Sequence, residues 1–427
     1  MPLMTFRGLL ERLEAAGELK RVGAPVPLGS VAQRIADEEA AANRALLFTG
    51  FIDAPGRLAT NVYGTLARVA SAVDTTPAIL WDVLQQAVVR PGVPRTGPAG
   101  WKAEGPVNLG HLPIPVHSAE DAGPYLTAGV VILEDPATGL TNLSYVRLQV
   151  QGRDRLGFNA ATPHTAAIAA RALEGQGRLE VAVAIGVPPA MALVAAATTD
   201  EGRDDLGVAA ALDPQLTLVG CDSVALQAPA EAEILIQGEI RAGETALEGP
   251  FGESMGTYTA PVLRPVIRVR QVALRPDAIL HSVAGGQSAE HITLLGVKVH
   301  QELATLQATF PEIVRVTLPR VGGARLVILT LRDRRPASAI LRAVLGIRLV
   351  RMAICVDPDV DPERAEDLAW SLVRRTREVG RILLLPASDR RGPLTKIGVD
   401  ATAVNFGAMD ERRVQPAPWQ DPAGDRA

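Results

Sequence analysis

The chain reads Glu233-Ile-Leu-Ile-Gln-Gly-Glu-Ile240, then Thr245-Ala-Leu-Glu-Gly-Pro-Phe-Gly-Glu-Ser-Met-Gly-Thr257, then Pro265-Val-Ile-Arg-Val-Arg-Gln-Val-Ala-Leu274. The outer two runs are rich in β-branched residues and typical of strands, whereas the middle run has the glycine and proline of a loop. A loop with two carboxylates, Glu248 and Glu253, between strands is where a sheet or barrel mounts acid–base chemistry. Taken alone, glutamates in a polar turn are usually solvated, so this spacing by itself indicates no function.

Strand-like runs continue outward from this stretch. They lie at 128–134, 142–151, 180–187, 215–219, 233–240, 265–274 and 278–283, with a helical pattern at 164–173. Many short strands separated by turn residues are typical of a barrel-like or split sheet. We therefore predict a central split β-barrel domain over residues 106–290.

The regions on either side have different patterns. Residues 1–105 combine helical spacing of apolar residues with two short strand-like runs, which predicts a small N-terminal α/β unit. Residues 291–311 have helical periodicity that ends at a proline and predict a linking helix. Strands and helices alternate over residues 312–400 and predict a C-terminal α/β domain, followed by a polar tail over 401–427. The fold class is therefore α/β (α+β).

Composition is that of an ordinary globular protein. The chain has 427 residues, of which 47% are hydrophobic and 21% charged, with a formal net charge of -4. This charge favours neither nucleic acid nor an anionic membrane as a partner. The two cysteines, Cys221 and Cys355, suit a reducing cytoplasm and predict neither a disulfide framework nor a zinc–thiolate site. The N-terminus has no signal-peptide pattern, and Pro188-Pro189 divides the most apolar stretch, so neither half spans a bilayer.

Ordinary nucleotide-phosphate motifs are absent, because no G-x-x-x-x-G-K-[ST] loop or well-placed G-x-G-x-x-G occurs. Asp357, Asp359 and Asp361 alternate like calcium ligands, but the glycine and the distant glutamate of a calcium loop are missing. Asp361 followed by Pro362 is instead typical of a helix N-cap and first turn. We predict a helix that begins there.

Residues 141–150, Thr-Asn-Leu-Ser-Tyr-Val-Arg-Leu-Gln-Val, form a second informative segment. Arg147 must face solvent or meet a negative partner, because an unpaired buried guanidinium is costly. Between Glu248 and Glu253 it would keep one acid ionised, while burial would raise the pKa of the other. From this segment alone, an exposed edge-strand arginine is the simpler interpretation. Asn142 and Arg147 have opposite parity in an ideal strand, so serving one site requires a strand end or a bulge.

Several short segments, taken together and in their order along the chain, resemble one known family over nearly the whole chain. They are Asp121-Ala-Gly-Pro-Tyr125, Asp135-Pro-Ala-Thr-Gly139, Asn142-Leu-Ser-Tyr-Val-Arg147, Gly186-Val-Pro-Pro189, Glu248-Gly-Pro-Phe-Gly-Glu253, Phe310-Pro-Glu-Ile313, Asp357-Pro-Asp-Val360 and Lys396-Ile-Gly-Val-Asp-Ala-Thr402. In combination they resemble the UbiD family of decarboxylases, which use prenylated flavin mononucleotide (prenylated FMN). The resemblance implies a carboxy-lyase with a flavin-binding central domain and a C-terminal domain that assembles a homodimer or higher oligomer.

The resemblance also implies roles for individual residues. Arg147, Glu248 and Glu253 match the family's catalytic network, in which Glu253 would supply the proton that replaces carbon dioxide. Arg147 and Glu248 would orient the substrate carboxylate and assist the transfer. The residues implied to bind the cofactor are Asn142, Ser144, Tyr145, Arg147, His164 and Arg351.

Two of these residues, Asn142 and His164, match the family's ligands of a divalent metal that bridges the flavin phosphate. Such hard donors suit Mn2+ or Mg2+, with K+ as an additional candidate ion. The family's third ligand is a glutamate, whereas this chain has Asp204-Asp205: Asp205 aligns with it across a one-residue gap and Asp204 without one. Considered without the resemblance, His164 is a helix-start histidine.

Further departures concern the flavin and the substrate. Arg351 stands where the family has a lysine, and Gly285 where some relatives have a cysteine near the flavin. Arginine binds phosphate well but is not equivalent to lysine. His291 is a candidate substrate residue or, equally, a solvent-facing histidine at a helix start. The implied substrate is an α,β-unsaturated or (hetero)aromatic carboxylic acid, and the implied partner is a flavin prenyltransferase that supplies the cofactor.

Two other functions remain open at this level. The altered third ligand and Arg351 favour a non-catalytic cofactor-binding or assembly subunit of a decarboxylase complex. A general flavin oxidoreductase on a split barrel rests on fold analogy alone.

Overall fold

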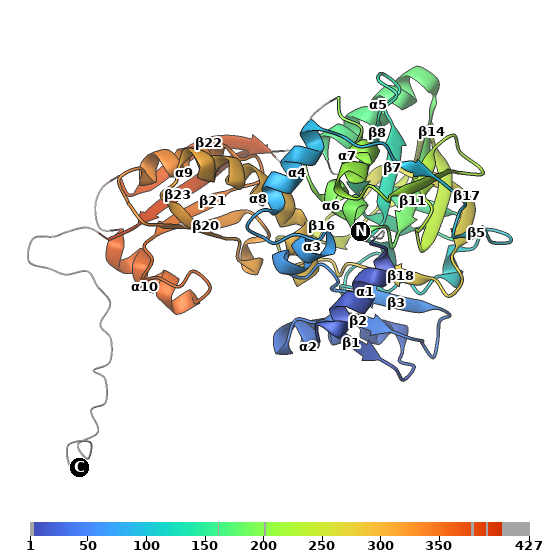
Figure 1. Cartoon of the computed structure of the whole chain (residues 1–427), viewed down its shortest axis with the longest axis horizontal. Helices are drawn as coiled ribbons and strands as arrows, with labels where there is room; N and C mark the ends of the chain where they lie inside the picture. Colours follow the sequence, from blue (N-terminus) through green and yellow to red (C-terminus); the bar gives the residue numbers. More distant parts are fainter. Residues whose placement is uncertain (1–3, 161, 200–201, 377–379, 390–391, 404–427) are drawn as a thin grey trace, which may run out of the picture. The chain divides into compact units, whose positions relative to one another are not determined.

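The structure, a computed structural model, describes residues 4–160, 162–199, 202–376, 380–389 and 392–403 and is shown in Figure 1. The chain divides into two units, Met1–Gln301 and Glu302–Ala427. Sheets and helices alternate in both, so the predicted α/β class is confirmed. No helix among the described residues is long and apolar enough to cross a membrane.

The first unit is built on a sheet of nine strands, counted over the described residues, with antiparallel pairing throughout. Its order is β6-β9-β10-β17-β14-β11-β7-β8, with β5 beside β17. The strands are β5 (Lys102–Ala103), β6 (Tyr125–Leu126), β7 (Val130–Glu134), β8 (Thr141–Tyr145), β9 (Leu148–Val150), β10 (Arg155–Phe158), β11 (Arg178–Ile185), β14 (Ile234–Glu248) and β17 (Val262–Leu274). The predicted split barrel is this sheet.

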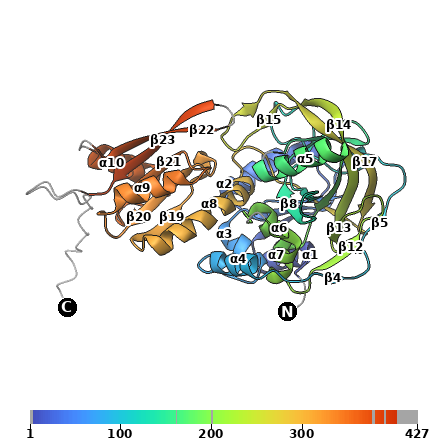
Figure 2. The same cartoon turned by 90° about the horizontal axis from the view of Figure 1, so that it is seen from above.

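Both faces of the central sheet are buried, because apolar residues alternate between two cores. Val130 and Ala182 belong to the core on one face, whereas Val131 and Val183 belong to the core on the other. This is the period of two that a strand imposes on its side chains. Helices that contribute residues to these cores include α5 (Pro163–Gln176), α6 (Pro189–Ala196) and α7 (Asp205–Leu212), seen in Figure 2.

The N-terminal sheet is not contiguous in sequence. Its order is β1-β2-β3-β18, and β18 pairs parallel with β3 although more than two hundred residues separate them. These strands are β1 (Leu19–Val22), β2 (Ala45–Phe48), β3 (Arg57–Thr60) and β18 (Ile279–His281). The helices of this region are α1 (Phe6–Ala15), α2 (Val31–Ala41), α3 (Leu66–Ala72) and α4 (Leu80–Val89), and a small third sheet contains β4 (Arg95–Thr96), β12 (Thr217–Gly220) and β13 (Gln227–Pro229). A strand from beyond the central sheet therefore completes the N-terminal sheet.

Two local expectations differ from the structure where the site lies. β14 runs to Glu248, which is paired with Val262, so Glu248 ends a strand and only Glu253 lies in the loop beyond it. The loop is shorter than predicted because the β14–β17 ladder resumes after an irregularity at Ile240/Thr245. Within the loop, β15 (Phe251–Gly252) pairs with β16 (Tyr258–Thr259).

The second unit contains a sheet in the order β19-β20-β21-β23-β22. Its strands are β19 (Ile313–Thr317), β20 (Leu326–Leu331), β21 (Met352–Val356), β22 (Ile382–Asp389) and β23 (Gly392–Ala401), its helices are α9 (Ala337–Gly346) and α10 (Ala365–Arg375), and α8 (Ala289–Thr309) runs into it from the first unit. The helix predicted to begin at Asp361 begins at Ala365, because the Asp361 carboxylate instead accepts the N–H of Glu363 in a turn. Most of the predicted tail, from residue 404 on, lies outside the described residues.

Candidate active site

Arg147 lies in a break between two strands. β8 ends at Tyr145 and β9 begins at Leu148, so the predicted continuous strand is interrupted at Val146 and Arg147. In one continuous strand Asn142 and Arg147 would face opposite sides of the sheet. The interruption removes that constraint, because residues on either side of it no longer alternate along a single strand. Arg147 can therefore face the same site as residues of β8.

The guanidinium of Arg147 binds both glutamates. Its Nε atom donates to Oε1 of Glu248 at 2.9 Å and its Nη2 atom to Oε2 of Glu248 at 3.0 Å, which is a bidentate pair. Nη1 donates to Oε1 of Glu253, and Nη2 also reaches the Thr259 hydroxyl at 3.3 Å. The structure thus joins three side chains that the sequence separates by 101 and 106 residues.

The two acids differ in their surroundings. The Glu248 side chain is 2% exposed and both of its oxygens bind Arg147, whereas the Glu253 side chain is 26% exposed. Within the described part of the chain, Glu253 makes its hydrogen bond through one carboxylate oxygen. Glu248 is therefore held as a structural anion, and Glu253 keeps an oxygen that can exchange a proton with a bound molecule.

The charge of Arg147 is stabilised in place. Burial opposes the charge, but the hydrogen bonds and charges of Glu248 and Glu253 outweigh it and raise the pKa of the guanidinium. Its Cζ atom also lies 4.6 Å from the centre of the Phe251 ring, a distance at which a cation is attracted to the ring face. Arg147 thus acts as a fixed cation beside the Glu253 carboxylate.

Buried polar atoms near β8 lack ordinary hydrogen-bond partners among the described residues. They are Nδ2 of Asn142, Oη of Tyr145 and Oδ1 of Asp205. Asp205 lies beside β8, because its Oδ2 atom accepts the N–H of Leu143 at 2.7 Å. Burial raises the pKa of Asp205 to about 6, although the hydrogen bond from Leu143 and the charge of Lys298 partly oppose the shift. The unpaired Oδ1 atom of Asp205 is an acceptor that fits a bound cation, whereas the unpaired Nδ2 atom of Asn142 is a donor, so a metal would need the amide oxygen of Asn142 instead.

The alternative ligand Asp204 is differently placed. Its Oδ1 atom accepts the N–H of Thr141 at 3.2 Å, and its side chain is less buried than that of Asp205. His164 lies in the first turn of α5, where the Thr162 hydroxyl caps the helix, and it is exposed. Among the residues that the structure describes, no group of three histidine, cysteine or carboxylate side chains forms a metal cluster.

The other predicted residues lie in distinct surroundings. Ser144 accepts a hydrogen bond from Thr165 at 3.1 Å, and Arg351, in the second unit, binds Asp389. Nδ1 of His291 donates to the Gly286 carbonyl at 2.8 Å, which fixes the ring orientation at the start of α8. Gly285 packs so closely that a Cβ would lie 3.0 Å from the Gly252 carbonyl oxygen. A cysteine in that position would require the Glu253 loop to shift.

Sequence reasoning missed several residues that border the site. Thr259 and Phe251 contact Arg147 directly, and Nε2 of His117 lies 3.1 Å from the Ser282 hydroxyl. Burial, and to a lesser degree the charge of His291, lower the pKa of His117 to about 4. The Asp121–Tyr125 segment was a recognisable motif, but its sequence carried no sign of what it contacts.

Comparison with known proteins identifies the family. Profiles of the 3-octaprenyl-4-hydroxybenzoate carboxy-lyase family match residues 10–88 with its N-terminal domain, 95–288 with its Rift-related domain and 293–401 with its C-terminal domain. The chain belongs to the UbiD family. Its UbiD relatives include the anhydromevalonate phosphate decarboxylase of Methanothermobacter thermautotrophicus, which is 31% identical over 73% of this chain and 76% of its own length.

Solved UbiD-class structures confirm the fold. HmfF from Pelotomaculum thermopropionicum in complex with FMN is 31% identical, has a TM-score of 0.87, and is matched over 96% of this chain and 97% of that one. An evolved dimeric form of HmfF in complex with prenylated FMN is also 31% identical, with a TM-score of 0.84 and 97% of both chains covered. The chain is thus a member of a decarboxylase family in which homologues bind prenylated FMN.

Proposed function

We propose that this protein catalyses the reversible, non-oxidative decarboxylation of an α,β-unsaturated or (hetero)aromatic carboxylic acid with prenylated FMN. The observation that carries the proposal is the Arg147 cation held between a buried Glu248 and a partly exposed Glu253. Loss of carbon dioxide from an sp2 carbon leaves charge that no side chain delocalises. Prenylated FMN, when bound, supplies the electron sink for that charge.

The chain's own residues supply orientation and the proton. Arg147 would bind the carboxylate of the substrate, and its bidentate pair with Glu248 supports this role by keeping the guanidinium fixed. Glu253, protonated, delivers its proton to the carbon that has lost carbon dioxide, and the Arg147 cation stabilises the carboxylate that remains. In the carboxylation direction the same residue removes that proton.

Cofactor binding is assigned to Asn142, Ser144, Tyr145, Arg147, His164 and Arg351. Asp205 would hold Mn2+ or Mg2+ through its buried Oδ1 atom, which lacks a partner among the described residues, and Asn142 would join it through its amide oxygen on the strength of the family resemblance. His164 completes the ligand set on the strength of the family resemblance, with K+ as an additional candidate ion. His291 is assigned to the substrate.

The protein's partners follow from the same proposal. A flavin prenyltransferase supplies the cofactor in the cytoplasm, and residues 312–400 assemble the chain into a homodimer or higher homo-oligomer. An HmfF form described as dimeric supports assembly of this kind. Size-exclusion chromatography with light scattering measures the oligomeric state directly.

The experiment is reconstitution by co-expression with a flavin prenyltransferase. We expect the absorption spectrum of a bound modified flavin and release of carbon dioxide from at least one member of a panel of cinnamic, hydroxybenzoic and heteroaromatic acids. In deuterium oxide the product should carry one deuterium at the decarboxylated carbon. A loaded protein that releases no carbon dioxide and exchanges no solvent deuterium into any product would instead identify a non-catalytic cofactor-binding or assembly subunit.

A further inference from the structure

A segment outside the catalytic set holds the backbone that carries Glu253. Oδ1 of Asp121 accepts the N–H of Gly252 at 2.8 Å, and Oδ2 accepts the N–H of Ser118 at 3.0 Å. Gly252 immediately precedes Glu253. A Cβ at Gly252 would lie 2.6 Å from the Ser118 hydroxyl, so the absence of a side chain at Gly252 leaves room for the Ser118 side chain.

The same segment also fixes the start of the loop. The N–H of Ala122 donates to the carbonyl of Pro250 at 2.9 Å, and the Tyr125 hydroxyl donates to that carbonyl at 3.2 Å. Gln149 joins the two segments, since its Oε1 atom accepts the N–H of Gly249 at 3.2 Å and its Nε2 atom donates to the Ala122 carbonyl at 3.2 Å. Backbone groups that are paired in this way resist displacement.

Ring contacts extend the connection to the cation. The Tyr125 ring lies 4.7 Å from the Phe251 ring, and the guanidinium of Arg147 lies 4.6 Å from the centre of that same ring. A movement of the 121–125 segment would therefore shift both Phe251 and the residue that binds the two catalytic acids.

On its other side, Glu253 is held by its own hairpin. The N–H of Glu253 donates to the Thr257 carbonyl and the N–H of Gly256 donates to the Glu253 carbonyl, each at 2.9 Å. The hairpin sets the local turn, but it does not tie that turn to the central sheet. Asp121 supplies a tie of this kind directly before Glu253, because it lies just ahead of β6 and binds Gly252.

We propose that Asp121 is a positioning residue for the proton donor: by holding the Gly252 N–H it fixes the point from which the Glu253 side chain extends toward the substrate. The inference rests on the proposed function, in which Glu253 delivers the proton. A displacement of about 1 Å at a catalytic group costs on the order of a hundredfold in rate, so the effect should appear in kcat.

The first test needs neither cofactor nor substrate. Amide hydrogen exchange is measured in the unloaded full chain for the wild type, Asp121→Asn and Asp121→Ala, with Asp53→Ala as the matched control. Asp53 also accepts a loop N–H, that of Leu28 at 2.8 Å, but in an exposed turn. We expect exchange at Gly252 to become at least about tenfold faster in Asp121→Ala and to stay unchanged in Asp53→Ala. If the Gly252 N–H exchanges at the same rate in Asp121→Ala as in the wild type, Asp121 does not hold that N–H.

The second test uses the protein loaded with prenylated FMN. We expect Asp121→Ala to lower kcat by about 10- to 100-fold with KM changed less than about threefold, since the loss concerns the proton donor. Asp121→Asn retains one acceptor oxygen and should recover part of the rate. The pH dependence of kcat should shift in both variants, because the surroundings of the Glu253 carboxyl change.

The outcomes separate this inference from the proposed function. If the loaded wild type releases no carbon dioxide from any acid, the proposed function fails, while the exchange experiment still decides whether Asp121 holds Gly252. If the wild type is active and both Asp121 variants keep its kcat and pH profile, the positioning role is wrong even where exchange is faster. If Asp121→Ala does not fold, the same comparison with Asp121→Asn decides the result.

Discussion

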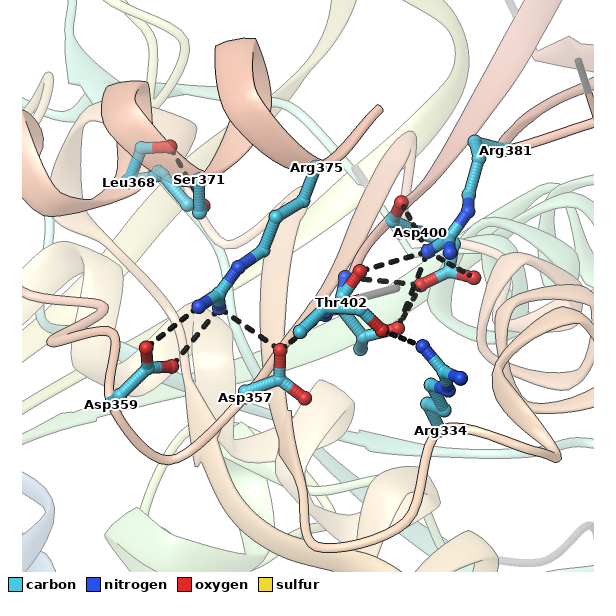
Figure 3. Close-up of polar contacts among 10 residues, drawn as sticks. Arg334, Asp357, Asp359, Leu368, Ser371, Arg375, Arg381, Asp400 and Thr402 are labelled. Carbon is cyan, nitrogen blue, oxygen red and sulfur yellow. Dashed lines mark hydrogen bonds and ion pairs between the residues drawn. The ribbon is translucent and has the colours of Figure 1, made fainter. Parts of the chain in front are cut away.

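Two arginines in this chain are each bound by two carboxylates and an aromatic ring. In the first unit, Arg147 binds Glu248 and Glu253 and lies 4.6 Å from the Phe251 ring centre. In the second unit, Figure 3 shows Arg375 directed at Asp357 and Asp359, and its guanidinium lies 4.7 Å from the Trp370 ring centre. The two clusters have the same kinds of groups, yet only the first is proposed as a reaction site.

The two clusters differ in how completely other groups of the protein bind the carboxylate oxygens of their acids. In the second cluster the Arg375 side chain is 1% exposed, and Asp357 also accepts the backbone N–H of Ala403, which Arg334 holds through its carbonyl. That cluster ties the end of β23 to α10 and to the loop after β21. In the first cluster, Glu253 keeps a carboxylate oxygen on the exposed side. An arginine between two acids is therefore no functional signature by itself.

The largest contrast should appear on neutralising one acid in each cluster. We expect Glu253→Gln to lower kcat of the loaded enzyme by about 10²- to 10⁴-fold, the usual contribution of a positioned proton donor. Asp359→Asn, which neutralises an acid of the second cluster, should leave kcat within about twofold. Steady-state carbon dioxide release and the flavin spectrum of each variant are the measurements. Equal rates for Glu253→Gln and the wild type would remove Glu253 from the proton-transfer step.

Removal of Arg375, the arginine of the second cluster, should lower stability. Arg375→Met leaves Asp357 and Asp359 without their buried cation, and we expect the free energy of unfolding of the second unit to fall by about 2–4 kcal/mol. Urea unfolding followed by tryptophan fluorescence and circular dichroism measures this change. Arg335→Met, which removes an 87% exposed side chain paired with Asp333, is the control and should be nearly indistinguishable from the wild type. A change no larger than that control would mean that the cluster contributes little to stability.

Substitution of the aromatic residue in each cluster should also affect stability in one cluster and kcat in the other, by smaller amounts than the substitutions above. Trp370→Leu is expected to cost about 1–2 kcal/mol of stability and to leave kcat unchanged, because the ring touches a structural cation. Phe251→Leu should lower kcat by about tenfold, because its ring contacts both Arg147 and Tyr125. Urea unfolding and steady-state kinetics on both variants test this. A kcat loss in Trp370→Leu would contradict the division between the two clusters.

Lowering the pH should change the stability contributions of His117, in the first unit, and of Asp357, in the second unit, in opposite directions. These are the smallest effects that we expect. Burial lowers the pKa of His117 to about 4, below its unfolded value, so the unfolded state binds more protons and stability is lost as pH falls from about 6.5 toward 4. Burial raises the pKa of Asp357, so its charge costs stability at neutral pH and that cost is relieved as pH falls toward the raised pKa.

Unfolding at pH 7 and pH 4.5 tests these signs against matched variants. The wild type should lose about 1 kcal/mol relative to His117→Gln on acidification, less than the full shift implies because the ring is partly exposed. Relative to Asp357→Asn it should gain a smaller amount. Identical pH slopes in the wild type and His117→Gln would show that the ring titrates as it does in the unfolded chain.

Much of the fold was readable in the sequence, for a local reason. Apolar and β-branched runs at 180–187 and 265–274 predicted strands, and in the structure the side chains of β11 divide between two cores. The end of β14 at Glu248, the strand β23 and the start of α10 at Ala365 were not predicted. These depend on which strand pairs with which, and on side chains such as Asp361 that bind a turn instead of a helix end.

The candidate site was predicted unevenly. The resemblance singled out Arg147, Glu248 and Glu253, and the structure brings them into contact. Roles for Asn142, Asp205 and His291 stay predictions, and the domain boundaries do as well. The Asp121 contact with Gly252 could not be predicted, since nothing in either segment's composition says that a carboxylate 131 residues away will accept that N–H.

The sequence by itself determined the chemical groups and the local strands and helices, because propensity and hydrophobic period act over a few neighbouring residues. Without the family resemblance, it did not determine which arginine would lie between which two acids. Only the tertiary structure decided that Glu253 keeps an oxygen for chemistry while Asp357 is engaged by the backbone of Ala403. The physical reason is that hydrogen-bond satisfaction and desolvation depend on distances through space, which chain order does not specify.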